Sequence, residues 1–251
     1  MTWKAEFEIH TGTPRAWEEP EQGENYRVTL LEAERGRFII KRGTSPFLVQ
    51  ELESEFRVLG ALQPEPFVPR PLARSADSFL FSYLEGEPMT AARRNASDGE
   101  RHHLMEEFGR ALRLIHRWRP ALPVPADPLA DAIAVARRNL AAGQAEIPPG
   151  TEKEAYLRRL SEWARTVQPD PVFCHGDYCL PNVLVKNGRL SGIVDWSRGG
   201  YWDRRIDLAA GVWTIGYNLG GGAFARTFLD AYGYAAPAES LKPFEALWRI
   251  F

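Results

Sequence analysis

HGDYCLPN at residues 175–182, followed by VLVKNGRLSGIVDW at 183–196, is the stretch on which the fold depends. An Asn-Gly pair at 187–188 separates two apolar runs, and this is the strongest short-range signal for a β-hairpin. Such a hairpin turns the chain back on itself and returns Asp195 to the loop at 175–182. The sequence therefore predicts that polar side chains from separate turns meet near this loop.

The polar residues in this stretch have the spacing of a kinase catalytic loop, H-R-D-x-x-x-x-N, with glycine at the arginine position. Phosphoryl transfer needs a carboxylate that orients the attacking hydroxyl and accepts its proton, and oxygen ligands that hold Mg²⁺ against the nucleotide phosphates. Asp177 fits the role of the base, while Asn182 and Asp195 fit the role of metal ligands. The alternative is that the loop is an ordinary turn, Asn182 caps a local element and Asp195 is a surface acid.

Lys41 is the candidate for the strand lysine that contacts the α- and β-phosphates in a kinase. The chain has five lysines and 26 arginines, so a lysine at the end of an apolar strand is unusual for this chain. Arginine would be the usual solvent-facing base here. The choice of lysine favours a site that needs a compact ammonium group.

Glu55 is the predicted partner of this lysine. At about 100° per residue, it falls within the apolar stripe of the helix expected over 46–62, whereas Glu51 lies at the margin and Glu53 points away. The stripe consists of Leu48, Leu52, Phe56, Leu59 and Leu62. A carboxylate on a buried face is costly unless it is paired, so Glu55 needs a cation, and Lys41 is available. The alternative is a solvated acid at the edge of a loosely packed helix.

Composition limits the kinds of partner. Of 251 residues, 44% are hydrophobic and 25% charged, and the net charge is only -2, which is typical of a globular protein without a bulk field for nucleic acid or an anionic membrane. The two cysteines are too few for a disulfide framework, which favours a reducing cytoplasm. No apolar signal core or membrane-spanning segment is present. We expect a cytoplasmic protein, a monomer or homodimer, with a small-molecule partner.

The chain is expected to divide after Leu84. Before that point, the sequence predicts a hairpin over 26–41, the helix over 46–62 and a strand over 78–84. Beyond it, Ser97 and Glu100 form a capping box for a helix, Asp127-Pro128 begins another that closes at Gly143, and Thr151 with Glu154 caps a third. The remainder from Ile206 is mostly helical, with 220–222 as a helix-to-helix turn. These elements predict lobes at 1–84 and 85–251.

This order of motifs resembles the aminoglycoside phosphotransferase and choline kinase family, which has the protein-kinase fold. The run 175–219 is most similar to aminoglycoside 3′-phosphotransferases, and the resemblance covers nearly the whole chain. It implies an α+β, bilobal fold with a small antiparallel β-rich N-lobe containing one helix, and a larger, mainly helical C-lobe. It also implies ATP, or GTP, as the phosphate donor together with Mg²⁺.

Carried over residue by residue, the resemblance supports Asp177 as the base, Asn182 and Asp195 as magnesium ligands, and Lys41 with Glu55 as the phosphate-positioning pair. It places backbone groups of Ser82 and Leu84 at the adenine edge, and Ile39 and Leu184 on the two adenine faces. Asp203 and Asp207 become structural acids, and Arg198 lies near the phosphate or the acceptor. Gly23-Glu24-Asn25 stands where a nucleotide-covering loop belongs, although it lacks the G-x-G-x-x-G pattern.

The C-terminal part of the chain, which the resemblance assigns to the acceptor, departs from this family's pattern. Aminoglycosides are polycations, yet the chain has Trp213 and Tyr217 where the family has charged residues, and Arg249 near the C-terminus. Beyond residue 201 there are five acids and five bases, and the loop after 143 offers only Glu146. Losing several ion pairs of about 1 to 4 kcal/mol each would weaken polycation binding by many decades.

Aromatic residues at this end would suit a larger or flatter hydroxylated molecule, unless they merely pack in the core. The residues are Trp202, Trp213, Tyr217 and Trp248, and the C-terminal Phe251 is a further acceptor-binding candidate. We predict transfer of a γ-phosphate to a small-molecule hydroxyl, with an aminoglycoside as the leading acceptor. A macrolide, a sugar or amino alcohol, or another metabolite is the alternative acceptor. A nucleotide-binding scaffold with little turnover is the alternative class.

Overall fold

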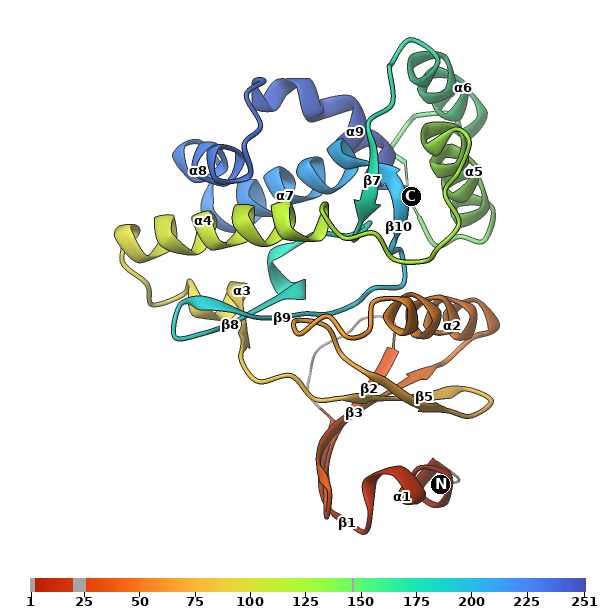
Figure 1. Ribbon diagram of the computed structural model, residues 1–251. Coiled ribbons are helices and arrows are strands. Elements are labelled where there is room, and N and C mark those ends of the chain that lie inside the picture. The colour runs from red at the N-terminus through yellow and green to blue at the C-terminus, as the bar shows by residue number, and fades with distance from the viewer. Residues whose placement is uncertain (1–2, 20–25, 146) are drawn as a thin grey trace. The chain divides into compact units, whose positions relative to one another are not determined.

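The computed structural model describes residues 3–19, 26–145 and 147–251. The described chain separates into two units, and Figure 1 labels their α-helices and most of their strands. The first unit contains the described residues up to Gly86 together with Ser191–Arg198, and the second contains Glu87–Leu190 and Gly199–Phe251. The segment that carries Asp195 therefore belongs to the first unit, although it follows much of the second in the sequence.

The first unit has an antiparallel sheet of five strands among the described residues, in the order β1-β2-β3-β5-β4. The strands are β1 Pro14–Glu18, β2 Tyr26–Ala33, β3 Gly36–Gly43, β4 Pro71–Arg74 and β5 Ser78–Ser82. The predicted hairpin is confirmed as β2 and β3, and the predicted strand at 78–84 ends two residues early, at Ser82. Sequence reasoning missed β1 and β4.

Helices α1 (Trp3–Thr11) and α2 (Pro46–Ala61) pack on opposite faces of this sheet, as Figure 1 shows. Phe7 of α1 joins a buried cluster with Ile40 and Leu80 on one face. The predicted N-lobe had one helix, and α1 is a correction. Its nine residues are too few to give the repeated apolar spacing by which the longer helix was recognised.

Helix α2 begins with favourable residues: the Ser45 hydroxyl accepts a hydrogen bond from Leu48 N, and Pro46 occupies the first turn. Its Phe56 ring lies 5.9 Å from the ring of Phe79 and 6.0 Å from that of Phe81, measured between centroids. This aromatic contact fixes α2 against the face of the sheet from which Lys41 extends.

The second unit holds short strand pairs beside a group of helices. Strand β6 pairs antiparallel with β8, and β7 pairs antiparallel with β10. The strands are β6 Glu87–Pro88, β7 Pro171–Cys174, β8 Val183–Lys186, β9 Arg189–Ile193, which runs on into the first unit, and β10 Gly200–Asp203. The predicted turn after β8 is confirmed, with φ angles of 53° at Asn187 and 72° at Gly188, as a tight hairpin turn requires.

The helices of the second unit follow the predicted order. They are α3 Met89–Ala92, α4 Asp98–Ile115, α5 Pro128–Ala141, α6 Lys153–Ala164, η1 Leu180–Asn182, α7 Arg204–Leu219, α8 Ala223–Tyr232, η2 Ala238–Leu241 and α9 Lys242–Trp248. Helix α4 packs along α8, and α7 lies against α8 and α9. Within the described residues, no helix combines the length and apolar character needed to cross a membrane.

Most helix starts agree with the sequence. The capping box of Ser97 and Glu100 is present at α4, and the Asp127 side chain caps α5. The predicted cap of α6 is wrong: Glu152, not Thr151, accepts hydrogen bonds from the amides of Glu154 and Ala155. The carboxylate of Glu152 reaches these two amides, which leaves no capping role for the threonine.

Candidate active site

In the first unit, a buried ion pair joins strand β3 to helix α2. Lys41 lies opposite Phe79 in the sheet register, so its side chain extends to the face covered by α2. Its Nζ donates to Glu55 Oε1 at 2.8 Å and Oε2 at 2.9 Å. The predicted pair is therefore present, and only 3% of the Glu55 side chain is exposed.

Asp195 lies beside this pair and contacts Lys41 Nζ through Oδ1. Its backbone has a φ of 64°, in the left-handed region that non-glycine residues rarely adopt outside turns and functional sites. The next residue, Trp196, donates its backbone N–H to Glu55 Oε1 at 3.3 Å. Burial alone would lower the pKa of the Lys41 ammonium, but Asp195 and Glu55 raise it above its ordinary value. Lys41 is thus a permanent cation held between two carboxylates.

In the second unit, the loop at 175–182 begins where strand β7 ends and is held by the buried Asp207 of α7. The two oxygens of that carboxylate accept the backbone N–H groups of His175 at 2.7 Å and Gly176 at 2.8 Å. Gly176 has a φ of 85°, which favours glycine over a residue with a side chain. This explains locally why the motif has glycine at its second position.

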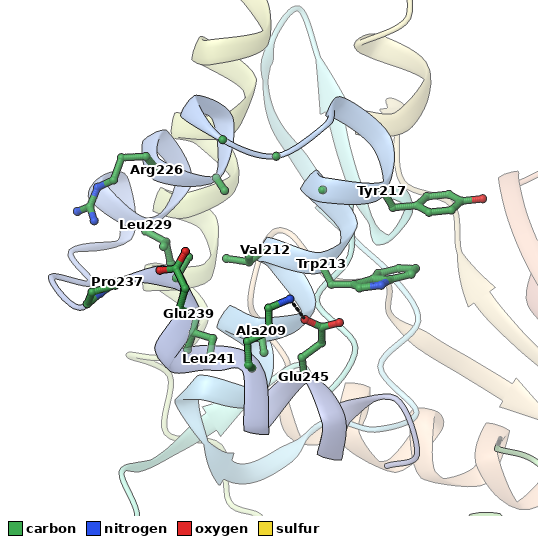
Figure 2. A pocket seen from close by; sticks show the side chains of 16 residues that line it. Ala209, Val212, Trp213, Tyr217, Arg226, Leu229, Pro237, Glu239, Leu241 and Glu245 are labelled. Carbon is green, nitrogen blue, oxygen red and sulfur yellow. Dashed lines mark hydrogen bonds and ion pairs between the residues drawn. The ribbon is translucent and has the colours of Figure 1, made fainter. Parts of the chain in front are cut away.

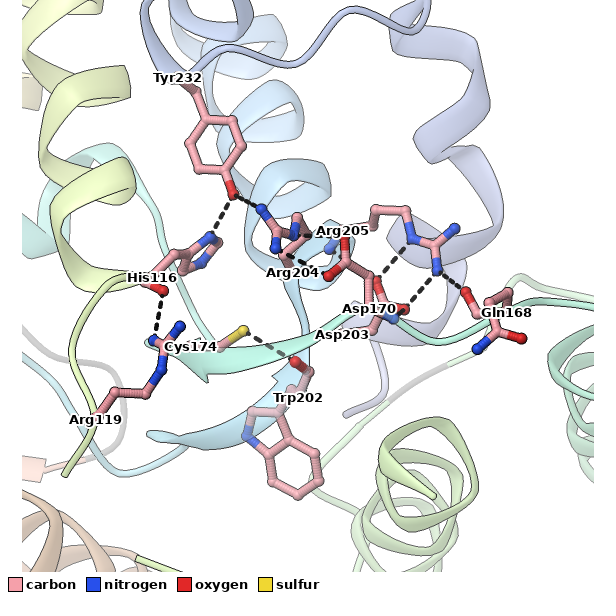
Figure 3. Close-up of polar contacts among 10 residues, drawn as sticks. All are labelled: His116, Arg119, Gln168, Asp170, Cys174, Trp202, Asp203, Arg204, Arg205 and Tyr232. Atoms are coloured by element: carbon pink, nitrogen blue, oxygen red, sulfur yellow. Dashed lines mark hydrogen bonds and ion pairs between the residues drawn. The ribbon is translucent and has the colours of Figure 1, made fainter. Parts of the chain in front are cut away.

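A polar network lies beside strand β7, and Figure 3 shows part of it around Cys174, His116 and Tyr232. His116 bonds Tyr232 Oη through Nδ1 at 2.7 Å and Asp207 Oδ2 through Nε2 at 3.1 Å. Tyr232 also accepts from Arg204 at 3.2 Å, and burial raises its pKa to about 12. Asp203 caps α7 and pairs with Arg205. Asp203 and Asp207 thus form the structural contacts that the sequence implied for them.

Potential metal-binding atoms of His116, Cys174 and Asp207 lie within 4.8 Å of one another in this network. The Asp207 oxygens already accept backbone N–H groups, and burial raises the pKa of the Cys174 thiol well above its usual range. Cys174 also contacts the Trp202 carbonyl at 3.6 Å. These groups already have hydrogen-bond partners and support the loop. They do not indicate a cation-binding site.

Asp177 is half-buried, and groups from its own loop and from α9 orient its carboxylate. Asn182 Nδ2 donates to the Asp177 carbonyl at 2.9 Å and lies 3.4 Å from Oδ2. Trp248 Nε1 donates to Oδ1 at 3.1 Å, and Cys179 Sγ lies 3.7 Å from the same oxygen. The structure therefore brings together Asp177 and Asn182 in one unit, and Lys41, Glu55 and Asp195 in the other.

The residues predicted to surround adenine lie on strands. Ile39 belongs to β3 and Leu184 to β8, and each is half-buried. The backbone N–H of Ser82 already donates to the Arg70 carbonyl at 2.9 Å, so this donor is engaged within the protein. Leu84 follows β5 and is half-buried. Their contacts with a nucleotide stay predictions, and Gly23-Glu24-Asn25 lies outside the described residues.

At the predicted acceptor end, Trp213 and Tyr217 lie one turn apart on α7 and stack at 5.4 Å between ring centroids. Phe251 is buried, and its ring packs edge-on against Trp202 at 4.9 Å, so an acceptor contact for it stays a prediction. Arg198 is half-buried in the first unit, and its role also stays a prediction. Glu146 lies outside the described residues.

A cavity of about 590 Å³ lies among α7, α8, η2 and α9, and Figure 2 shows its lining. Trp213 and Tyr217 contribute to its wall, together with apolar residues such as Val212 and Leu229. Asp177 does not line it. The cavity is therefore separate from the carboxylate that the sequence predicts as the base.

Sequence reasoning missed the contacts of Trp248 with Asp177 and of Lys41 with Asp195. These pairs are 71 and 154 residues apart in the chain. Trp248 was singled out only as one of several aromatic residues. No local pattern could have identified its partner, because the hydrogen bond depends on how α9 packs.

Comparison with known proteins shows the family of the chain. The model of the phosphotransferase enzyme family matches residues 17–244. The chain belongs to this family. An aminoglycoside 3′-phosphotransferase of Streptomyces fradiae is 32% identical over 197 residues, which are 73% of each protein. A probable aminoglycoside 3′-phosphotransferase of Lactococcus lactis is 46% identical over 59 residues, 24% of this chain and 22% of that protein.

Solved structures of the phosphotransferase family show the same fold. The aminoglycoside phosphotransferase of Streptomyces rimosus in complex with ADP and streptomycin has a TM-score of 0.73 and 23% identity, covering 95% of this chain and 94% of that one. The predicted α+β, protein-kinase-like fold and the resemblance to aminoglycoside phosphotransferases are thus confirmed, and the chain is a phosphotransferase.

Proposed function

We propose that this phosphotransferase moves the γ-phosphate of ATP to a hydroxyl group of an aminoglycoside. The observation that carries this proposal is the placement of Asp177 in a loop clamped by Asp207, with Asn182 bonded to the same aspartate. Relatives named as aminoglycoside phosphotransferases support the acceptor class. GTP is the alternative donor that the family resemblance implies.

Asp177 acts as the base in this proposal. Its carboxylate orients the acceptor hydroxyl and takes the proton as the oxygen attacks the γ-phosphorus, while the bond from phosphorus to the ADP oxygen breaks. The bonds from Trp248 and Asn182 hold the carboxylate in one rotamer. A fixed carboxylate costs little reorganisation when the hydroxyl arrives.

Lys41 and Glu55 position the phosphates. Glu55 holds the ammonium through its two carboxylate oxygens, so the lysine side chain loses little further freedom when a phosphate binds. Because Lys41 stays charged, it provides a fixed positive group for the α- and β-phosphates.

Asn182 and Asp195 fit Mg²⁺ by their chemistry, since this ion prefers carboxylate and amide oxygens. Asn182 binds its own loop through Nδ2, so Oδ1 is the amide atom that remains as a ligand. The Asp195 side chain is 47% exposed although it contacts Lys41. When bound, Mg²⁺ supplies charge neutralisation at the nucleotide phosphates. The cytoplasmic location and the monomeric or homodimeric state stay predictions.

Purified protein, ATP and Mg²⁺ test the proposal, with ADP release followed in the presence of kanamycin A or streptomycin. We expect an aminoglycoside to raise ADP release strongly, and Asp177→Ala to lower the stimulated rate by about 10³-fold while nucleotide binding is kept. Asp98→Asn is the control, because the Asp98 side chain is 81% exposed on α4. A flat response to the aminoglycosides, or full activity of Asp177→Ala, would refute the proposal.

A further inference from the structure

Arg93 extends its side chain from the end of α3 to the end of α7. Its Nη2 donates to Asn218 Oδ1 at 2.7 Å. The Nε of the same guanidinium is buried and has no hydrogen-bond partner among the described residues. Asn218 is a neutral amide, so this contact leaves the positive charge of Arg93 uncompensated. A partly buried cation without a counter-ion is unfavourable in a folded protein.

Two further arginines lie beside this guanidinium. Arg94 follows in the chain, and Arg101 of α4 approaches the Arg93 carbonyl through its Nε at 3.4 Å. Burial, together with repulsion from Arg94 and Arg101, lowers the pKa of the Arg93 guanidinium. Like charges gathered in this way repel one another, so the arrangement favours an anion from outside the chain.

Carboxylates of the protein offset little of this charge. Asp98 pairs with Arg101 at 3.1 Å, but its side chain is 81% exposed, so water screens the pair. In residues 26–145 and 147–251, no carboxylate forms an ion pair with Arg93 or Arg94, and the charged groups that act on Arg93 are both cations. Three guanidinium groups and one carboxylate therefore leave two positive charges at this place.

Asn218 holds the Arg93 side chain in place. The Nδ2 of Asn218 donates to the Thr214 carbonyl at 2.8 Å and to Thr214 Oγ1 at 3.2 Å, and Thr214 is buried. These bonds keep Asn218 Oδ1 directed at Arg93, so the guanidinium loses little further freedom when a ligand binds. A fixed guanidinium suits an oxyanion, because its N–H groups can bind two oxygens side by side.

We propose that Arg93, Arg94 and Arg101 form a binding site for a phosphate group on the second unit. Such a group carries a charge of about −1.5 to −2 at neutral pH and several acceptor oxygens, so it balances the two positive charges. A carboxylate or a chloride ion would balance only one. Free phosphate and a phosphate ester share this chemistry. The site uses none of the residues that the transferase proposal uses, so the two proposals stand or fall separately.

Calorimetric titration at low ionic strength tests the site and identifies the source of the phosphate group. The full chain is first saturated with a non-hydrolysable ATP analogue and Mg²⁺, so that its nucleotide site is filled. Inorganic phosphate and glycerol 3-phosphate are then titrated separately, with sodium chloride at matched ionic strength as the reference. We expect binding of at least one phosphate probe and none of chloride. The probe that binds more tightly shows whether the site favours the free anion or an ester.

Variants locate the binding on the three arginines. Arg93→Gln should raise the Kd at least about tenfold, and Asn218→Asp about fivefold, because a carboxylate at 218 would neutralise Arg93 within the protein. Arg94→Gln changes an exposed side chain and should also raise the Kd about fivefold, so it keeps the test valid if Arg93→Gln does not fold. Arg110→Gln is the matched control on α4, because its guanidinium already pairs with two glutamates, and it should change the Kd less than about twofold.

The opposing explanation is that Arg93 only ties α3 to α7 through Asn218. In that case neither phosphate probe binds, or the Kd is the same in wild type, Arg93→Gln and Arg94→Gln. Either result would overturn the phosphate site. Binding that the arginine variants weaken and Arg110→Gln does not would establish it.

Discussion

The Lys41 region and the Asp177 region hold their charged groups in different ways. In the first, opposite charges are buried together, with 3% of the Glu55 side chain exposed. In the second, a half-buried carboxylate is held by an amide and an indole N–H, and aromatic side chains of α7 lie beyond the indole toward the surface. A buried pair tolerates little change because each charge needs the other. Substitutions of exposed side chains such as Tyr217 cost little by comparison, so the two regions differ in what substitutions should cost.

The largest expected contrast comes from substituting two glutamates of one helix. Glu55→Gln should lower the free energy of unfolding by about 3 kcal/mol, because it breaks a buried pair, and should lower kcat/KM for ATP at least about tenfold. Glu53 is exposed and pairs with Arg74 at 3.5 Å, so Glu53→Gln should cost less than about 0.5 kcal/mol. Urea denaturation and steady-state kinetics measure both. Equal losses in the two variants would mean that burial is not what sets the first region apart.

A smaller effect is expected from the clamp that the Asp207 carboxylate forms on the loop at 175–182. In Asp207→Asn only one oxygen remains for the backbone N–H groups of His175 and Gly176, which should cost about 2 kcal/mol of stability. The kcat should fall with the KM for ATP unchanged, since the clamp orients Asp177 and does not touch the first unit's ion pair.

The control for this clamp is Asp170→Asn, which removes an exposed partner of Arg204 and should cost less than about 0.5 kcal/mol. Thermal unfolding and initial rates distinguish the two variants. A change in the KM for ATP in Asp207→Asn, at unchanged kcat, would show that the clamp does not orient Asp177.

The smallest effect concerns Tyr232, whose hydroxyl bridges His116 and Arg204. Tyr232→Phe should cost about 1 kcal/mol near neutral pH. Burial raises the folded-state pKa to about 12, above an unfolded value of about 10, so the unfolded chain loses its proton first as pH rises. The stabilisation by the neutral hydroxyl is fully present below about pH 10 and is lost toward about pH 12.

Urea denaturation of wild type and Tyr232→Phe at several alkaline pH values checks this window. The stability difference between the two proteins should shrink between about pH 10 and about pH 12, because only wild type has this titrating group. A difference that stays constant across the window would show that the hydroxyl titrates alike in the folded and unfolded states.

Local patterns predicted much of the first region. The 3.6-residue period of α2 predicts Glu55 on its buried face, and the rarity of lysine in this chain singles out Lys41 as the cation that pairs with it. Helix α1 was not predicted because nine residues are too few to show a repeated apolar spacing. The cap of α6 was misplaced because Thr151 and Glu152 are neighbours and both residue types can cap a helix.

The chain by itself determined which chemical groups are available: the loop at 175–182, the hairpin that follows it, the Lys41–Glu55 pair and the family to which they belong. Tertiary packing alone decided that Trp248 of α9 donates to Asp177 and that Asp207 clamps the loop from α7. It also decided that Trp213 of α7 packs on Trp248. The physical reason is the distance along the chain over which each effect acts. Periodicity and turn chemistry act over a few residues, whereas these contacts join segments tens of residues apart, whose meeting depends on the packing of whole helices.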